Sequence, residues 1–195
     1  EWVPLDFTEV EGLNVLASGG ADTFTIDEQA GALIPLSDGI FYDGGTGSDS
    51  LVLTGETTVQ ASYSVGPEED QGRVIHQIPQ GATQTVMFEN LEPVLDVVPG
   101  TLTVQATDAP NAINYIEGPN SGTDVDPLDV DTDVTGQILI DSFETYEFTN
   151  KTDLVINAGA GDDTVNLNNS IAPDALSTIT VNAGDAPAGD AVIVH

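Results

Sequence analysis

A turn that recurs at a fixed interval is the feature of this sequence that most restricts its fold. Segment 18–24, which contains Asp22, is followed 27 residues later by a similar Gly-rich turn that contains Asp49. The same interval of 27 residues separates Asp163 from Asp190. Short blocks of alternating apolar and polar residues follow these turns, and such blocks are typical of β-strands. Strands that return at a constant interval predict coils stacked on one another.

The spacing therefore predicts an all-β fold, a parallel β-solenoid or β-helix of about seven coils. Each coil would lie ~4.8 Å from the next, and the stacked coils would share a core. No stretch of ten or more residues keeps a helical period, so helix is not expected. An antiparallel β-sandwich is the alternative, because short strands and turns suit it as well. In a solenoid, Phe24 and Leu51 would be equivalent inward positions one coil apart, as would Val165 and Val192.

The repeat covers most of the chain but not all of it. We expect residues 1–195 to form a single module, with internal repeats near 7–53, 88–116 and 140–194. Two segments fit the repeat least well, and we expect them to project from the stack as irregular loops. These segments are 59–85 and 121–135.

The charge balance restricts the partners of the chain. It has 33 Asp and Glu residues against two Lys and Arg residues, which gives a net charge of −31. Nucleic acids and anionic membrane surfaces are bound through Lys and Arg, so neither is an expected partner. No apolar run approaches the ~18 residues of a membrane span, so membrane insertion is not expected. Water, salt or a bound divalent cation must balance the acids. The absence of Cys and the scarcity of Lys favour an extracellular bacterial protein.

Two turns carry a nonapeptide pattern that has a known mechanism. Residues 44–52 match G-G-x-G-x-D-x-U-x, in which U is a large apolar residue, and residues 158–166 match it with one Gly replaced by Ala. Here the sequence resembles the haemolysin-type (RTX-like) calcium-binding repeats of large bacterial surface proteins. The resemblance implies an adhesin-like protein at the cell surface, with Ca²⁺ as its cofactor. In that family the nonapeptides run in tandem, whereas here they stand singly.

The candidate metal ligands are the Asp and Gly residues of the turns. Gly permits a positive φ that aims carbonyl groups inward, and Asp supplies the hard oxygen that Ca²⁺ prefers. In stacked coils, a cation between neighbouring Asp residues would remove their mutual repulsion. The alternative is that each Asp accepts hydrogen bonds from turn backbone. The residues predicted on this basis to bind metal are Asp22, Gly45, Gly47, Asp49, Gly161, Asp162, Asp163, Asp185 and Asp190.

We expect a structural or adhesive module of a bacterial surface protein or fibre, stiffened by calcium, and not an enzyme. Its apolar ends would stack head to tail on neighbouring copies or tandem modules, and surface glycans are a further expected partner. A secreted β-helix polysaccharide-active enzyme is one alternative, because residues 161–163 resemble the Gly-Asp-Asp of polygalacturonases. The companion motifs of that family are absent from the sequence. A carbohydrate-binding module is the other alternative.

Three Thr-x-Thr segments bear on ice binding, which requires flat ranks of threonine. They are residues 23–25, 101–103 and 178–180. Their places in the repeat predict different phases of the coil, so they would form no common rank. Ice binding is therefore not expected.

Overall fold

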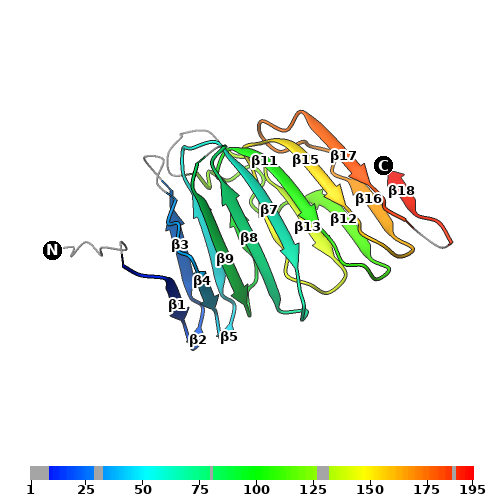
Figure 1. The fold of residues 1–195 in the computed structure, drawn as a ribbon. Coiled ribbons are helices and arrows are strands. Elements are labelled where there is room, and N and C mark those ends of the chain that lie inside the picture. Colours follow the sequence, from blue (N-terminus) through cyan, green and yellow to red (C-terminus); the bar gives the residue numbers. More distant parts are fainter. Residues whose placement is uncertain (1–8, 29–32, 80, 127–131, 186–187) are drawn as a thin grey trace.

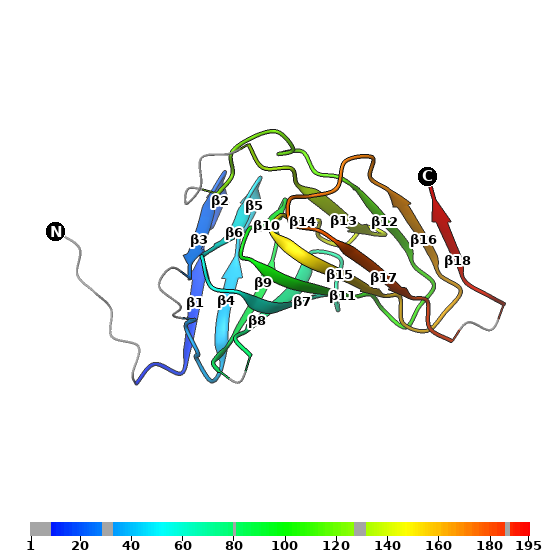
Figure 2. The same ribbon diagram turned by 90° about the horizontal axis from the view of Figure 1, so that it is seen from above.

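A computed structural model of the chain describes residues 9–28, 33–79, 81–126, 132–185 and 188–195. The described residues form eighteen strands and no helix, so the fold is all-β. Two eight-stranded sheets face each other around a shared apolar core (Figures 1 and 2). No helix that could cross a membrane is found among the described residues.

The first sheet contains every strand from which the chain crosses to the second sheet. Its strands pair in parallel, except that β8 is antiparallel to both of its neighbours, β7 and β9. In spatial order they are β1 (Gly12–Leu16), β4 (Gly39–Asp43), β9 (Thr83–Glu89), β8 (Gln71–Gln77), β7 (Val59–Val65), β11 (Gly100–Gln105), β15 (Lys151–Asn157) and β17 (Thr178–Asn182).

The second sheet repeats this plan, with β13 as its antiparallel strand. In spatial order its strands are β3 (Thr23–Asp27), β6 (Ser50–Thr54), β10 (Val94–Asp96), β14 (Tyr146–Phe148), β13 (Gly136–Ile140), β12 (Ala112–Glu117), β16 (Thr164–Asn168) and β18 (Ala191–Val194). The short strands β2 (Gly19–Gly20) and β5 (Thr46–Gly47) pair with each other beside the two sheets.

The chain crosses repeatedly from the first sheet to the second, for example from β4 to β6 and from β15 to β16. The interval of 27 residues sets the strand register, because Phe24 pairs with Leu51 and Val165 with Val192 in parallel ladders. Both predicted equivalences are therefore confirmed.

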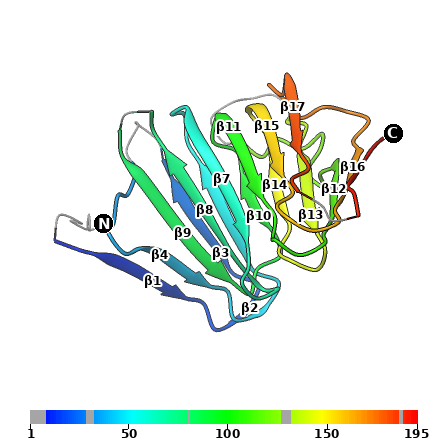
Figure 3. The same cartoon turned by 45° about the vertical axis from the view of Figure 1, so that its right-hand side comes forward.

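The sheets are mixed, and neither the purely parallel arrangement nor the antiparallel sandwich expected from the sequence describes them. Segment 59–85 is not a projecting loop, because it forms β7, β8 and the start of β9 within the first sheet (Figure 3). Its alternation places Val59, Ala61 and Tyr63 in the core, which explains the strand. Strands β12 to β14 are joined by antiparallel pairing in the second sheet, as β7 to β9 are in the first. We call these two segments the antiparallel excursions.

The described parts of segment 121–135, residues 121–126 and 132–135, are irregular and connect β12 to β13. An isolated bridge between Thr123 and Asp133 joins their two sides. Asp133 is buried, and one oxygen of its carboxylate accepts hydrogen bonds from the backbone N–H groups of Val125 and Asp126, each at 3.0 Å. This carboxylate therefore shapes the loop.

Aromatic side chains join the two excursions inside the core. Tyr63 from β7 stacks on Tyr146 from β14, with ring centroids 4.5 Å apart and planes tilted by 19°. Both side chains are fully buried. The pair spans the space between the sheets, so packing ties each antiparallel excursion to the other.

Candidate functional site

The turns that lead from the first sheet to the second form two stacks. The first turn stack comprises residues 17–22, 44–49 and 90–93, and the second comprises 106–111, 158–163 and the described part of 183–190. Backbone hydrogen bonds connect the turns within a stack, for example from Thr46 N to Ser18 O at 2.9 Å. The predicted metal ligands all lie in these two stacks.

Glycine is required where one turn lies directly on the next. A Cβ atom on Gly47, where φ is +142°, would lie 1.5 Å from the carbonyl oxygen of Gly20. A Cβ on Gly184 would lie 1.7 Å from the carbonyl oxygen of Gly159. The repeated glycines therefore serve close approach of backbone to backbone, a role that no larger residue can fill.

The aspartates of the turns bind backbone in the neighbouring turn. Asp49 Oδ1 accepts a hydrogen bond from the backbone N–H of Asp22 at 2.7 Å, and Asp190 Oδ1 accepts one from Asp163 N–H at 3.0 Å. Asp163 Oδ1 likewise accepts one from Asn111 N–H at 2.8 Å. Each carboxylate thus caps the preceding turn, and no such N–H donor to the Asp22 carboxylate exists among the described residues.

Two observations bear on calcium at these turns. Asp49 and Asp163 are buried, and the Oδ2 atom of each has no hydrogen-bond partner. An orphaned buried carboxylate oxygen fits a cation, because burial without a partner is costly. However, no group of three or more acidic or His residues in the described chain is arranged around a common metal position. A cation there would depend on these two oxygens and on backbone carbonyl groups.

The remaining predicted ligands do not converge on these oxygens. Asp162 is exposed and accepts a hydrogen bond from Ala188 N–H at 2.8 Å, and Asp185 forms a bridge with Ala160. Gly45 and Gly161 pack against the backbone of Ser18 and Ala109. They therefore act as parts of the turn stack in this structure.

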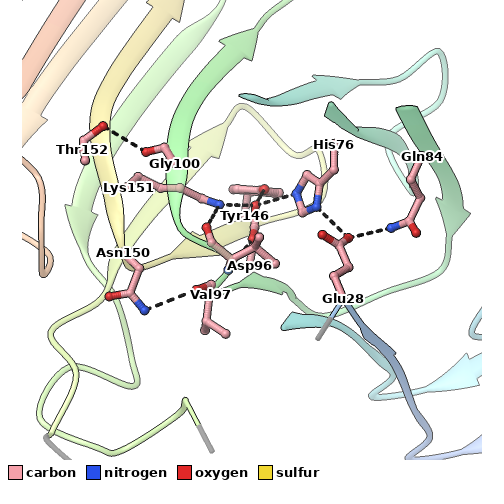
Figure 4. Close-up of polar contacts among 11 residues, drawn as sticks. Glu28, His76, Gln84, Asp96, Val97, Gly100, Tyr146, Asn150, Lys151 and Thr152 are labelled. Carbon is pink, nitrogen blue, oxygen red and sulfur yellow. Dashed lines mark hydrogen bonds and ion pairs between the residues drawn. The ribbon is translucent and has the colours of Figure 1, made fainter. Parts of the chain in front are cut away.

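A cluster of charged side chains lies inside the core, and sequence reasoning missed it. It lies near the turns that return the chain from the second sheet to the first (Figure 4). We call it the ion cluster. All of its side chains are essentially buried, and its members are Glu28, His76, Gln84, Asp96, Tyr146 and Lys151.

His76 bridges the two carboxylates of the ion cluster. Its Nδ1 lies 2.8 Å from Glu28 Oε1 and its Nε2 lies 3.0 Å from Asp96 Oδ2. Lys151 Nζ lies 2.8 Å from the same Asp96 oxygen, and the Tyr146 hydroxyl donates a hydrogen bond to it at 2.5 Å. Protonated His76 and Lys151 together balance the two formal negative charges.

Further hydrogen bonds support the ion cluster, although the buried Glu28 Oε2 has no hydrogen-bond partner. Lys151 Nζ also donates to the carbonyl oxygen of Val98, while the backbone N–H of Val98 donates to Asp96 Oδ1 at 3.0 Å. Gln84 Nε2 donates to Glu28 Oε1 at 2.6 Å. These contacts offset the large desolvation cost of burying charge.

The cluster strongly perturbs its own titration. Burial lowers the pKa of His76, but the charges and hydrogen bonds of Asp96 and Glu28 outweigh burial and raise that pKa to about 9. Burial raises the pKa of Asp96, but Lys151 and His76 outweigh it and hold the pKa well below the usual range. Burial and the Asp96 charge raise the pKa of Tyr146 well above its ordinary value. At neutral pH His76 is therefore a buried cation.

The sequence carries a weak signal for this cluster. His76 follows Val74 at the two-residue spacing of a strand, so it shares that residue's inward face. Lys151 begins a strand and is one of only two Lys and Arg residues in the chain. The six members lie on or directly after six different strands, so no local motif could have united them. The closed geometry suits stabilisation of the core, since no substrate can reach it.

The structure corrects one part of the expectation about the threonine segments, the different phases of 101–103 and 178–180. Thr101 and Thr178 both pair with Asp153, and Thr103 and Thr180 both pair with Val155. Segments 101–103 and 178–180 therefore lie in the same two rows of the first sheet, separated by β15. Segment 23–25 lies in the second sheet.

No protein-family model, curated protein or solved structure matches the chain. The function must therefore be inferred from the geometry of the turns, the ion cluster and the surfaces.

Proposed function

We propose that the chain is a structural or adhesive module of an extracellular bacterial surface protein or fibre. In this proposal the fold is a β-solenoid interrupted by two antiparallel excursions, and modules stack head to tail. The observation that carries the proposal is the uncovered core at β17 and β18, which are the last strands of the two sheets.

Apolar side chains that belong to the core are exposed at this end. Val192 and Val194 pair with Val165 and Leu167, so they point toward the interior, yet 49% and 74% of their surfaces are exposed. Ile179 of β17 is in the same situation, with 40% exposed. Apolar surface next to two open strand edges favours the addition of further strands.

The opposite end offers matching edges. It is formed by β1 and β3, which are the outermost strands of the same two sheets. A second copy could pair its β1 with β17 and its β3 with β18, so that both sheets continue in parallel. The turn stack would continue too, because the N–H of Asp190 would meet the partly exposed carboxylate of Asp22 in the next copy. A head-to-tail contact of this kind propagates without closing.

Calcium is the second part of the proposal. The orphaned Oδ2 atoms of Asp49 and Asp163 are the ligands that we assign to it, one in each turn stack. A bound divalent cation would also reduce the self-repulsion of a chain with 33 acids and two Lys and Arg residues. The module is proposed to be non-catalytic, since the ion cluster is closed to solvent.

Light scattering and electron microscopy of the purified chain test the stacking. In calcium we expect linear assemblies whose mass grows with concentration. Val194→Asp places a charge on the inward side of the open end and should leave monomers. Ile193→Asp places the same charge on the outward side of the same strand, because Ile193 pairs with the outward Asn166, and should preserve assembly. A wild-type chain that stays monomeric at every concentration would contradict the proposal, as would equal effects of the two variants.

A further inference from the structure

The outer face of the first sheet contains a groove with an unpaired cation. The groove has a volume of about 540 Å³, within the range of about 300–1,000 Å³ for small-ligand sites. It lies over β4, β9, β8 and the end of β7, where Figure 1 shows the strands side by side. Arg73 lines it together with Phe41, Pro67 and Met87.

Among the described residues, Arg73 has no ion-pair partner although acids dominate the chain. The ion pairs of the described residues all involve His76 or Lys151. Lys151 is fully buried, so Arg73 is the exposed member of the two Lys and Arg residues. Glu89 also lines the groove, but its Oε2 accepts a hydrogen bond from Gln71 Nε2 at 3.0 Å. The guanidinium group is therefore available to a ligand.

The row of Arg73 and the row on its side away from the β7–β8 turn are free of acids, whereas Asp43 and Glu89 occupy the row on the other side. The row of outward residues that contains Arg73 runs across all eight strands without a carboxylate: Asn14, Phe41, Met87, Arg73, Ser64, Gln105, Asn157 and Asn182. The adjacent row has no charge at all: Thr85, Ile75, Ser62, Thr103, Val155 and Thr180. An anionic ligand could approach Arg73 along this face in spite of the net charge of −31.

We propose that this groove binds a carboxylate-bearing sugar unit of an acidic polysaccharide. The planar guanidinium group of Arg73 can form two parallel hydrogen bonds to a carboxylate. Phe41 and Met87, partly exposed, offer apolar surface to the C–H face of a sugar ring. Ser64 lines the groove, and Gln105 and Asn157 follow it beyond the groove, so that polar groups lie ~4.8 Å apart across the strands. This spacing is close to one sugar unit in an extended chain. The inference does not depend on head-to-tail stacking.

The test uses an oligogalacturonate hexamer and its methyl ester, which differ only in charge. Both are titrated into the full chain, with a calcium chelator present to exclude calcium bridging, and followed by calorimetry and by NMR of backbone amides. We expect the acid to bind, with shifts at groove residues, and the ester to bind at least tenfold more weakly.

Variants of the full chain locate the binding. Arg73→Gln should weaken binding about tenfold to a hundredfold, and Arg73→Lys should weaken it less. Phe41→Ala should weaken acid and ester alike, since it removes the shared apolar contact. Thr178→Ala, on the same face but outside the groove, is the control that should change nothing. Equal affinity for acid and ester, normal binding by Arg73→Gln, or binding only with calcium present would each overturn the proposal.

Discussion

The turn stacks and the ion cluster bury carboxylates at different places by different means. In the turn stacks, each buried carboxylate caps a backbone N–H of the preceding turn, and the arrangement recurs at 27 and 52 residues along the chain. In the ion cluster, His76 and Lys151 neutralise Glu28 and Asp96 once, with no repetition. This acidic chain therefore places one of its two Lys and Arg residues in the interior, and it uses backbone donors where its fold repeats.

The largest expected effect comes from removing the buried cation. Lys151→Met leaves Asp96 buried with less compensation, and we expect the free energy of unfolding to fall by about 3–5 kcal/mol. Urea denaturation measures the loss. Thr152→Ala, at the residue next to Lys151, is the control. It removes a hydroxyl that donates a hydrogen bond to the Gly100 carbonyl oxygen, and it should lower the free energy of unfolding far less. If Lys151→Met is as stable as the wild type, the ion cluster does not stabilise the core.

Gly47→Ala tests the turn stacks. The new Cβ would clash with the Gly20 carbonyl, and we expect a loss of about 2–4 kcal/mol. Gly189 also has a positive φ, of +116°, but a Cβ there would meet nothing within 4 Å. Gly189→Ala therefore measures the cost of the backbone conformation alone. Equal losses in the two variants would show that close stacking contributes nothing.

The pH dependence of stability should reveal His76. Its folded pKa of about 9 exceeds the ordinary value of 6.5, so its contribution is complete below pH 6.5 and is lost as the pH rises through 9. We expect a decrease on the order of 1–3 kcal/mol over this range. Chemical denaturation at a series of pH values measures it.

Glu144 should produce a separate decrease in the free energy of unfolding at lower pH. Burial raises its pKa to about 7, and the nearby charges of Glu92 and Asp70 add to that rise against a hydrogen bond from Leu91 N–H. The folded chain therefore holds the Glu144 proton more tightly than the unfolded chain does. As a result, the free energy of unfolding should fall as the pH rises from 4.5 to 7. Glu144→Gln should abolish this lower decline and leave that of His76, whereas a profile unchanged by the variant would refute the assignment.

The smallest expected effect distinguishes the two roles of Asp49. Asp49→Asn keeps an Oδ1 acceptor for Asp22 N–H but removes the charge of the orphaned oxygen. We expect a change of about 1 kcal/mol or less in chelator, and loss of any calcium-dependent rise in melting temperature. Thermal melts in calcium and in chelator at equal ionic strength measure both. Identical wild-type midpoints in the two conditions would contradict the proposed calcium role.

The sequence predicted what repeats and missed what does not. The 27-residue interval correctly paired Phe24 with Leu51, because turn spacing sets strand register locally. It also brought Asp22 next to Asp49, although the contact is through the Asp22 backbone. The excursion β7 to β9 carries no repeat signal, so its strands were expected to be a loop. The cue for it was the inward alternation of its strands, as from Val59 to Tyr63 and from Val74 to His76.

The ion cluster could not be predicted for a different reason. Glu28 follows β3 and Asp96 is the last residue of β10, both in the second sheet, while His76 lies on an antiparallel strand whose existence the repeat did not indicate. Their meeting depends on long-range strand order, which no spacing within the sequence encodes. The groove at Arg73 has the same origin, since it forms where β4, β9 and β8 meet.

The two antiparallel excursions have a mechanical consequence. Under a force applied to the ends, β18 and β17 can peel away singly, because each pairs with only one strand, and the residues that they pair with lie 27 and 25 positions earlier. β16 and β15 then keep one partner each, but β14, the next strand toward the N-terminus, is paired on both sides, with β10 and with β13. Under tension the terminal strands would detach one at a time, and the force needed would then rise at the antiparallel excursion, which limits further unfolding from this end.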